Sequence, residues 1–230
     1  MSVMLTWYGH SAFKLEADGH SVLIDPFITR NPVATVKAED VNAGTILLTH
    51  AHNDHVGDTV EIAKRNDATV IATAELASWI GTQGVKNTIG ANHGGTVTFE
   101  GGSTKFVPAW HTSSYSTDEG AVAPGVPAGH VVRFGGKTIY FAGDTCLFLD
   151  MQLIGEEGLD VAVIPVGDHF TMGPKDAVRA ASLLNAGTVI PCHYNTFPPI
   201  RQDPGKFKSD VESSTKSTVL ILEIGSPVEL

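Results

Sequence analysis

Six consecutive residues carry the strongest chemical signal in the chain. They read His50-Ala51-His52-Asn53-Asp54-His55, an HxHxDH pattern that directly follows an apolar run. In an extended segment, His50 and His52 point to the same side and can share one metal ion, because side chains alternate. A turn after them would aim Asp54 and His55 at a second ion nearby. Imidazole and carboxylate groups are ligands of zinc-like ions, so the pattern predicts a metal site rather than a loop of surface histidines.

Two ions need more ligands than these four, and three further candidates each follow a predicted strand. They are His111 in PAWH, Asp144 in YFAGD and His193 in IPCH. Strands that end at one edge of a sheet bring such side chains together. Asp144 is well placed to bridge both ions through its two oxygens. Two ions about 3.5–4 Å apart would lower the pKa of a shared water and supply hydroxide for attack on a carbonyl or phosphoryl group.

Other polar residues lie close to these motifs. Asp54 is predicted to be catalytic as well as a ligand, by orienting the water or shuttling its proton. His169 in GDHFTMGP is the second catalytic candidate, as a substrate contact or proton donor, with a plain loop residue as the alternative. His10 in GHSAF has either a role near the site or a structural hydrogen bond. Asp25 in LIDP either braces the metal-binding loop or caps the turn before Pro26.

The elements that would position these residues are strands and helices in alternation. An antiparallel meander is predicted over residues 4–8, 12–16 and 21–24, and a buried strand over residues 45–49 leads into the HxHxDH pattern. Further strands are predicted at 68–73, 96–99, 105–109, 131–134, 138–142, 161–166 and 188–192, and helices at 58–66, 75–80 and 174–184. Residues 112–129 are the longest irregular segment and could cover a site. Two sandwiched sheets with helices outside would satisfy this order within one domain over residues 1–230.

The order HxHxDH, His, Asp, His resembles that of the metallo-β-lactamase fold superfamily over nearly the whole chain. The segments GHSAF, LIDP, GDTVEIAKR, VPAWH, AGDT and FTMGP look like a narrower group, the uncharacterised metal-dependent hydrolases related to ascorbate-6-phosphate lactonase. The resemblance implies an α/β fold, specifically a four-layer αββα sandwich. It also implies a ligand set: His50, His52 and His111 for the first metal, Asp54, His55 and His193 for the second, and Asp144 as the bridge.

Composition limits the class of protein. Hydrophobic residues make up 42% and charged residues 17% of the chain, as in ordinary globular proteins. No apolar run approaches the roughly 20 residues needed to cross a bilayer, and residues 1–13 lack the basic start of a signal peptide. We therefore expect a soluble, cytoplasmic protein in which Cys146 and Cys192 are reduced and buried. Trp7, Trp79 and Trp110 are expected in the core.

These observations predict a metal-dependent hydrolase that acts on a small ester, lactone or phosphoester-type compound. Two divalent metal ions are its expected cofactors, with zinc first and manganese, iron or nickel as alternatives. Two other functions stay open, a nucleic-acid-processing phosphodiesterase and a di-iron oxidoreductase. The first is disfavoured by a net charge of −10 with scattered lysines and arginines. The second is disfavoured by His52, where such relatives tend to have Glu. No membrane partner is expected, and a homo-oligomer is compatible with the sequence.

Overall fold

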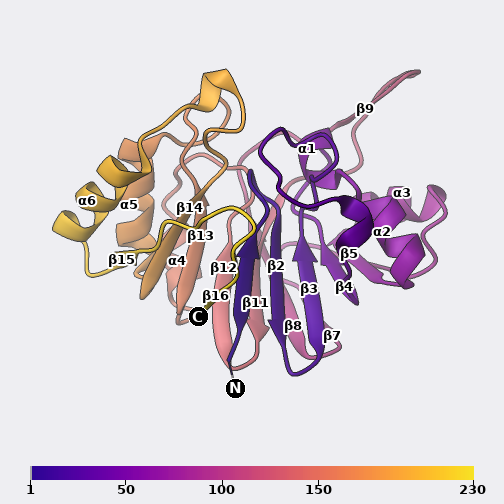
Figure 1. The fold of residues 1–230 in the computed structure, drawn as a ribbon, viewed down its shortest axis with the longest axis horizontal. Coiled ribbons are helices and arrows are strands. Elements are labelled where there is room, and N and C mark those ends of the chain that lie inside the picture. The colour runs from indigo at the N-terminus through magenta and orange to yellow at the C-terminus, as the bar shows by residue number, and fades with distance from the viewer. Residues whose placement is uncertain (1) are drawn as a thin grey trace.

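Two mixed β-sheets pack face to face at the centre of the computed structural model, which describes residues 2–230 (Figure 1). Within these residues the first sheet has seven strands in the order β16-β1-β2-β3-β4-β5-β6. They are β1 (Met4–Trp7), β2 (Phe13–Ala17), β3 (His20–Ile24), β4 (Thr45–Leu47), β5 (Thr69–Thr73), β6 (Thr88–Ala91) and β16 (Val228–Glu229). The second described sheet has seven strands in the order β15-β14-β13-β12-β11-β8-β7. They are β7 (Thr96–Phe99), β8 (Gly102–Pro108), β11 (Ala128–Phe134), β12 (Lys137–Phe141), β13 (Val161–Pro165), β14 (Thr188–Cys192) and β15 (Thr218–Val219).

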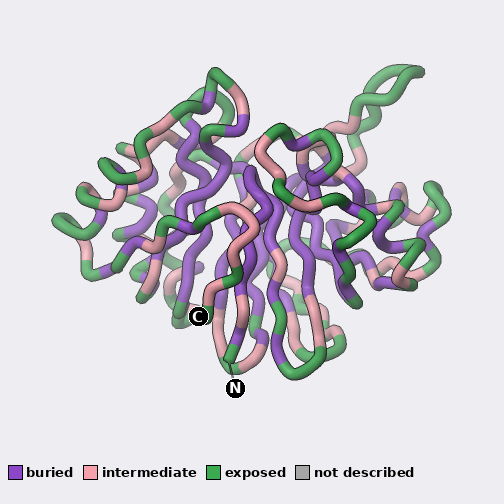
Figure 2. Tube along the Cα trace, in the orientation of Figure 1, coloured by how far each residue is buried: buried purple, intermediate pink, exposed green. Residues whose placement is uncertain are grey.

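Helices cover the outer face of each sheet. The first sheet carries α2 (Thr59–Asn66) and α3 (Ala74–Thr82), whereas α5 (Pro174–Leu184) and α6 (Pro204–Ser214) lie along the second sheet and α4 (Met151–Gly155) packs on α5. Buried residues concentrate in the sheets and in the helix faces that are turned toward them (Figure 2). On α5 these are Ala177, Ala180, Ala181 and Leu184, the spacing of one helical face. The predicted four-layer αββα sandwich is confirmed.

The strands before the HxHxDH pattern show why this segment is held rigidly. All of β4 is buried, and it pairs in parallel with β3 on one side and β5 on the other. Leu47 belongs to the core between the sheets, whereas Ile46 and Leu48 belong to the core beneath the outer helices. Both faces of the strand are therefore covered, which explains its continuous apolar sequence.

Several expectations about individual residues are wrong. Residues 112–129 are not wholly irregular, because β9 (Tyr115–Thr117) and β10 (Gly120–Val122) form a hairpin that projects from the body (Figure 1). Trp110 is 64% exposed rather than part of the core, since it lies on the loop that carries His111 out of the sheet after β8. Cys146 is exposed for a similar reason, on the loop after β12, although it and Cys192 are free cysteines within residues 2–230.

Besides the β9–β10 hairpin, five described strands and helices were not predicted. They are β6, β15, β16, α4 and α6, of which β15, β16 and α4 are short and α6 has a polar sequence. None of the helices in residues 2–230 has the length and apolar character that crossing a membrane requires.

Candidate metal centre

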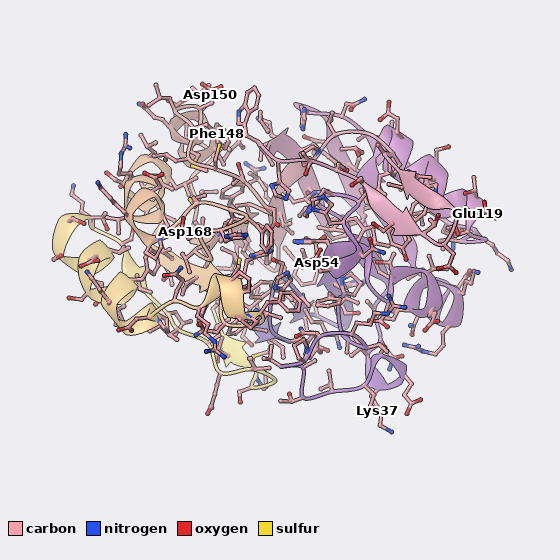
Figure 3. All side chains as sticks on the ribbon, turned by 90° about the horizontal axis from the view of Figure 1, so that it is seen from above. Lys37, Asp54, Glu119, Phe148, Asp150 and Asp168 are labelled. Carbon is pink, nitrogen blue, oxygen red and sulfur yellow. The ribbon has the colours of Figure 1, made fainter. Side chains whose placement is uncertain are left out.

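Loops from both sheets supply the polar side chains that the sequence singles out. His10 follows β1, the HxHxDH pattern follows β4, His111 follows β8, Asp144 follows β12 and His193 follows β14. The pairing of the strands makes β1 parallel to β4, and makes β8 parallel to both β12 and β14. The ends of these strands meet at one edge of the sandwich. Seen from above that edge, Asp54 lies near the middle of the molecule, between the two halves (Figure 3).

A single helical turn divides the HxHxDH pattern as predicted. β4 ends at Leu47, and α1 (Asn53–Val56) begins directly after His52. The turn closes at Gly57, whose φ is +44°. A Cβ atom at this position would lie 2.6 Å from the Phe27 Cα atom, so only glycine fits. The turn aims the second half of the pattern in a new direction.

The first group of candidate ligands consists of His50, His52, His111 and Asp144, whose ligand atoms all lie within 4.8 Å of one another. The His50 Nε2 atom lies 2.9 Å from His52 Nδ1. The His111 Nε2 atom lies 3.5 Å from Asp144 Oδ2. His50 is fully buried, whereas His52 and His111 are half-buried. The structure therefore brings together the side chains predicted for the first metal and the predicted bridge.

The second group consists of His10, Asp54, His55 and His193, and its ligand atoms also lie within 4.8 Å of one another. Asp144 belongs to the first group, where its Oδ2 atom lies 3.5 Å from His111 Nε2, and it also contacts the second group. Its Oδ1 atom is 3.4 Å from His55 Nε2, and its Oδ2 atom is 3.1 Å from His193 Nε2. One carboxylate therefore contacts rings of both groups, the position that a bridging ligand requires.

Buried atoms without partners show that both groups suit a cation. His55 Nε2, Asp144 Oδ1 and His193 Nε2 are buried and have no hydrogen-bond partner among residues 2–230. An unsatisfied buried polar atom costs about 1–3 kcal/mol, and a divalent ion between these atoms would satisfy them. Imidazole nitrogens and carboxylate oxygens suit zinc, manganese, iron and nickel. The residues present therefore fit bound divalent metal.

Burial and neighbouring charges favour the ligand forms of His50 and Asp144, but the protonated form of His55. Burial lowers the pKa of His50 well below its ordinary 6.5, so the ring is neutral at pH 7. Burial alone would raise the pKa of Asp144, but His193 and His55 outweigh it and hold that pKa well below its usual value. Burial opposes a charged His55 ring, yet Asp144 and Asp25 raise the pKa of His55. A metal ion at His55 Nε2 would therefore displace a proton.

Asp25 fixes the orientation of one histidine in each group. Its Oδ2 atom accepts hydrogen bonds from His55 Nδ1 (2.8 Å) and Thr49 Oγ1 (2.6 Å), and its Oδ1 atom accepts one from Thr49 N (2.9 Å). Because the Thr49 hydroxyl gives its hydrogen to Asp25, it accepts from His50 Nδ1, 3.0 Å away. His50 then carries its proton on Nδ1 and leaves Nε2 free for a metal, and His55 reaches the same form when a metal displaces its Nε2 proton. Of the two roles considered for Asp25, the structure supports the brace.

His10 lies in the second group, although the sequence left its role open. It is fully buried, with Nε2 3.2 Å from Asp54 Oδ2 and Nδ1 3.0 Å from Thr196 Oγ1. Its ring centroid lies 4.0 Å from that of His193. Its φ of +56° is in the left-handed region, which costs a residue other than glycine about 1–3 kcal/mol. The signal in the sequence was its place directly after a strand.

His169 is not brought into either group of ligands in the described structure. It lies on the loop after β13, where it is exposed and packs against Phe170, with 4.5 Å between the ring centroids. Its catalytic role stays a prediction. His130, in contrast, is fully buried and makes hydrogen-bond contacts with Thr104 Oγ1 and Leu48 O, so its role is structural.

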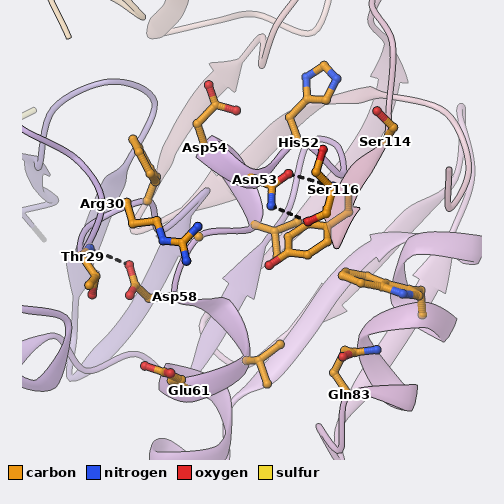
Figure 4. A pocket seen from close by; sticks show the side chains of 16 residues that line it. Thr29, Arg30, His52, Asn53, Asp54, Asp58, Glu61, Gln83, Ser114 and Ser116 are labelled. Atoms are coloured by element: carbon orange, nitrogen blue, oxygen red, sulfur yellow. Dashed lines mark hydrogen bonds between the residues drawn. The ribbon is translucent and has the colours of Figure 1, made fainter. Parts of the chain in front are cut away.

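A cavity of about 870 Å³ opens beside the ligands (Figure 4). His52 and Asp54 form part of its wall, and Arg30, Trp79 and Tyr115 form other parts. Arg30 and Trp79 were not expected near the site, whereas Tyr115 lies in residues 112–129, the segment expected to cover one. They come from a loop, a helix and the projecting hairpin, and only the packing of these elements brings them together.

The chain is similar to proteins described as metal-dependent hydrolases. A family model described as a β-lactamase superfamily domain matches residues 4–193. A UPF0173 metal-dependent hydrolase from Anoxybacillus flavithermus is 53% identical over 229 residues, covering 98% of this chain and 99% of the relative. Another from Geobacillus thermodenitrificans is 54% identical over 207 residues, covering 89% and 91%. The solved structure of Igni18, a metallo hydrolase from the archaeon Ignicoccus hospitalis, matches with a TM-score of 0.90 and 40% identity, covering 100% of this chain and 99% of that one.

Proposed function

Because the chain belongs to the metallo-β-lactamase superfamily, we propose that it is a metal-dependent hydrolase of a small ester, lactone or phosphoester-type compound. The observation that carries the proposal is that Asp144 contacts histidines of both groups of ligands. Such an arrangement suits two metal ions that share one water molecule. Zinc is the first expectation, with manganese, iron or nickel as alternatives.

The ligand roles follow from the two groups. His50, His52 and His111 would hold one ion, Asp54, His55 and His193 would hold the other, and Asp144 would contact both. When bound, the ions supply hydroxide at neutral pH and positive charge for the developing oxyanion. His52 and Asp54 also border the cavity, so a substrate in the cavity lies against both groups of ligands.

Asp54 is the carboxylate best placed to handle protons. Its side chain is 35% exposed, whereas that of Asp144 is 3% exposed and closed off from solvent. We assign to Asp54 the orientation of the attacking water and the acceptance of its proton. His10 would hold Asp54 in place through the 3.2 Å contact to its Oδ2 atom.

A screen of purified protein tests the proposal. Protein loaded in turn with zinc, manganese, iron or nickel is analysed for metal content and then given lactones, carboxyl esters, phosphodiesters and RNA. We expect metal-dependent hydrolysis of at least one small-molecule class, and a loss of at least about a hundredfold in Asp144→Asn. Asp160→Asn is the matched control, because this carboxylate accepts a hydrogen bond from Thr138 N at the opposite end of the sheet.

Three outcomes would contradict parts of the proposal. Fully loaded protein that hydrolyses no small molecule would refute the hydrolase function. Cleavage of RNA alone would favour the nucleic-acid-processing alternative. Unchanged turnover in Asp54→Asn with full metal content would remove the proton-handling role of Asp54.

A further inference from the structure

The cavity beside the ligands has the size and position of a substrate pocket. Its volume of about 870 Å³ lies within the range of about 300–1,000 Å³ that is typical of small-molecule sites. His52 and Asp54 line part of it, and Arg30 and Trp79 line other parts. Figure 4 shows Arg30 on a different segment of the chain from these two ligands. A substrate that fills the cavity and reaches the metal ligands therefore also contacts side chains that are not ligands, such as Arg30.

Arg30 offers a positive charge to the part of the substrate that does not contact the metal ligands. Among the described residues that line the cavity it is the one lysine or arginine, and its guanidinium group points into the cavity (Figure 4). Arg133 and Arg179 form ion pairs with carboxylates, at 2.7 and 3.5 Å. Arg30 forms no ion pair with any carboxylate in residues 2–230. A guanidinium group without a partner is a ready site for a planar anion that accepts two parallel hydrogen bonds.

The loop that carries Arg30 is anchored to the metal-binding region. Asp58 Oδ2 accepts hydrogen bonds from Ile28 N (2.8 Å) and Thr29 N (2.9 Å), directly before Arg30. Asp58 and Glu61 line the same side of the cavity as Arg30 (Figure 4). These two carboxylates would repel a phosphate dianion more strongly than a carboxylate, which carries one charge. Of these two anions, the carboxylate is therefore the one that the charges around Arg30 repel less.

Two aromatic side chains line another part of the cavity. Trp79 on α3 packs against Tyr115 on β9, with 4.7 Å between ring centroids, and both side chains line the cavity. The hairpin is fixed to α1 by Asn53, whose side chain donates to Ser116 O (3.1 Å) and accepts from Ser116 N (2.9 Å) (Figure 4). A planar or apolar part of a ligand would bury its surface on these rings.

We propose that this cavity binds substrates in which a carboxylate is attached to a planar or apolar group, and that Arg30 determines specificity by pairing with the carboxylate. The inference rests on the proposed hydrolase function, because it identifies the bound molecule as the substrate. It places the hydrolysed bond next to His52 and Asp54 and the carboxylate next to Arg30.

The test is calorimetric titration of full-length, metal-loaded protein with benzoate, its neutral counterpart benzamide, and phenyl phosphate. The variant is Arg30→Gln, and the matched control is Arg179→Gln, since Arg179 is exposed on α5. We expect Arg30→Gln to weaken benzoate binding about tenfold or more and to leave benzamide binding unchanged. Arg179→Gln should bind both like the unaltered protein.

Several results would overturn the proposal. Benzoate affinity that Arg30→Gln leaves unchanged would show that the carboxylate binds elsewhere, at the metal for example. No benzoate binding, or tighter binding of phenyl phosphate through Arg30, would also reject a carboxylate subsite. Binding is measured without turnover, so the two hypotheses fail separately. Arg30-dependent benzoate binding in protein that hydrolyses nothing would refute the hydrolase function and keep the subsite. Hydrolysis by protein whose benzoate binding does not depend on Arg30 would refute the carboxylate subsite and keep the hydrolase function.

Discussion

Replacing Asp25 by asparagine tests how the metal-binding histidines are held in one protonation form. In the native protein the Oδ2 atom accepts from His55 Nδ1 at 2.8 Å and from the Thr49 hydroxyl at 2.6 Å. An asparagine amide group at the Oδ2 position donates instead, so His55 Nδ1 must become an acceptor. The ring then carries its proton on Nε2, the atom that faces Asp144. In the other orientation of the amide, its NH₂ group meets the Thr49 N–H, and a buried donor loses its partner.

Either orientation costs about 1–3 kcal/mol, the price of one unsatisfied buried polar group. If this cost falls on metal binding, it corresponds to a loss of roughly 10- to 100-fold in affinity, as is typical when a residue behind a metal ligand is changed. We therefore expect Asp25→Asn to bind the metal of the second group about 10- to 100-fold more weakly. The assay is competition with a chelating dye, and nitrogen-15 NMR of the histidine rings reports the position of the proton.

Asp58→Asn is the control for this prediction. Asp58 is also nearly buried and also holds the loop after β3, but its Oδ2 atom accepts from the backbone of Ile28 and Thr29 rather than from a ligand. An asparagine oxygen can accept both of these bonds, so metal affinity should change less than about threefold. If Asp25→Asn bound two metal ions with the native affinity, the account of how Asp25 orients His50 and His55 would be refuted.

Three further changes have expected effects on stability. Gly143→Ala should lower the free energy of unfolding in urea by about 2–4 kcal/mol, since φ is +61° and the new Cβ would lie 2.7 Å from Thr49 Cβ; an unchanged midpoint would contradict this. Burial lowers the pKa of His130. Below about pH 6.5 the His130 side chain therefore binds a proton in the unfolded chain but not in the native protein. The free energy of unfolding then falls as the pH falls. His130→Gln should therefore show a shallower loss as pH falls below about 6.5, by up to about 1.4 kcal/mol per pH unit, whereas equal slopes would count against it. Removing metal with a chelator should lower the melting temperature, because metal at about a thousand times its Kd stabilises by about 4 kcal/mol; identical melting curves would argue against a native metal site.

Strand periodicity explains why so much of the ligand set could be found from the sequence. Each candidate ligand follows a run of buried residues. The strands that precede the ligands run parallel to one another within each sheet, so their carboxyl ends lie at the same edge. The turn inside the HxHxDH pattern was also predictable, because a metal-binding role requires Asp54 and His55 to face away from the direction of His52. Local sequence and the geometry of the sheet were sufficient for these residues.

Features that depend on the packing of loops could not be predicted in this way. Trp110 is as apolar as Trp7, and only the path of the chain after β8 decides that one is exposed and the other buried. The role of His10 depends on its contact with Asp54, 44 residues away in the sequence. The cavity depends on the Asn53 contacts that hold the hairpin beside α1. No periodic pattern encodes such contacts.

The link from Asp25 to both groups of ligands has a consequence for how the metals are acquired. Asp25 holds His55 directly and His50 through Thr49, so ordering one ring also orders the other. These hydrogen bonds come from the protein itself, so both rings are held in position whichever ion arrives first, and neither ion bears the entropic cost of orienting them. A change that displaces Asp25 should therefore weaken both occupancies together, and a chelator should remove both ions from such a variant more easily than from the native protein.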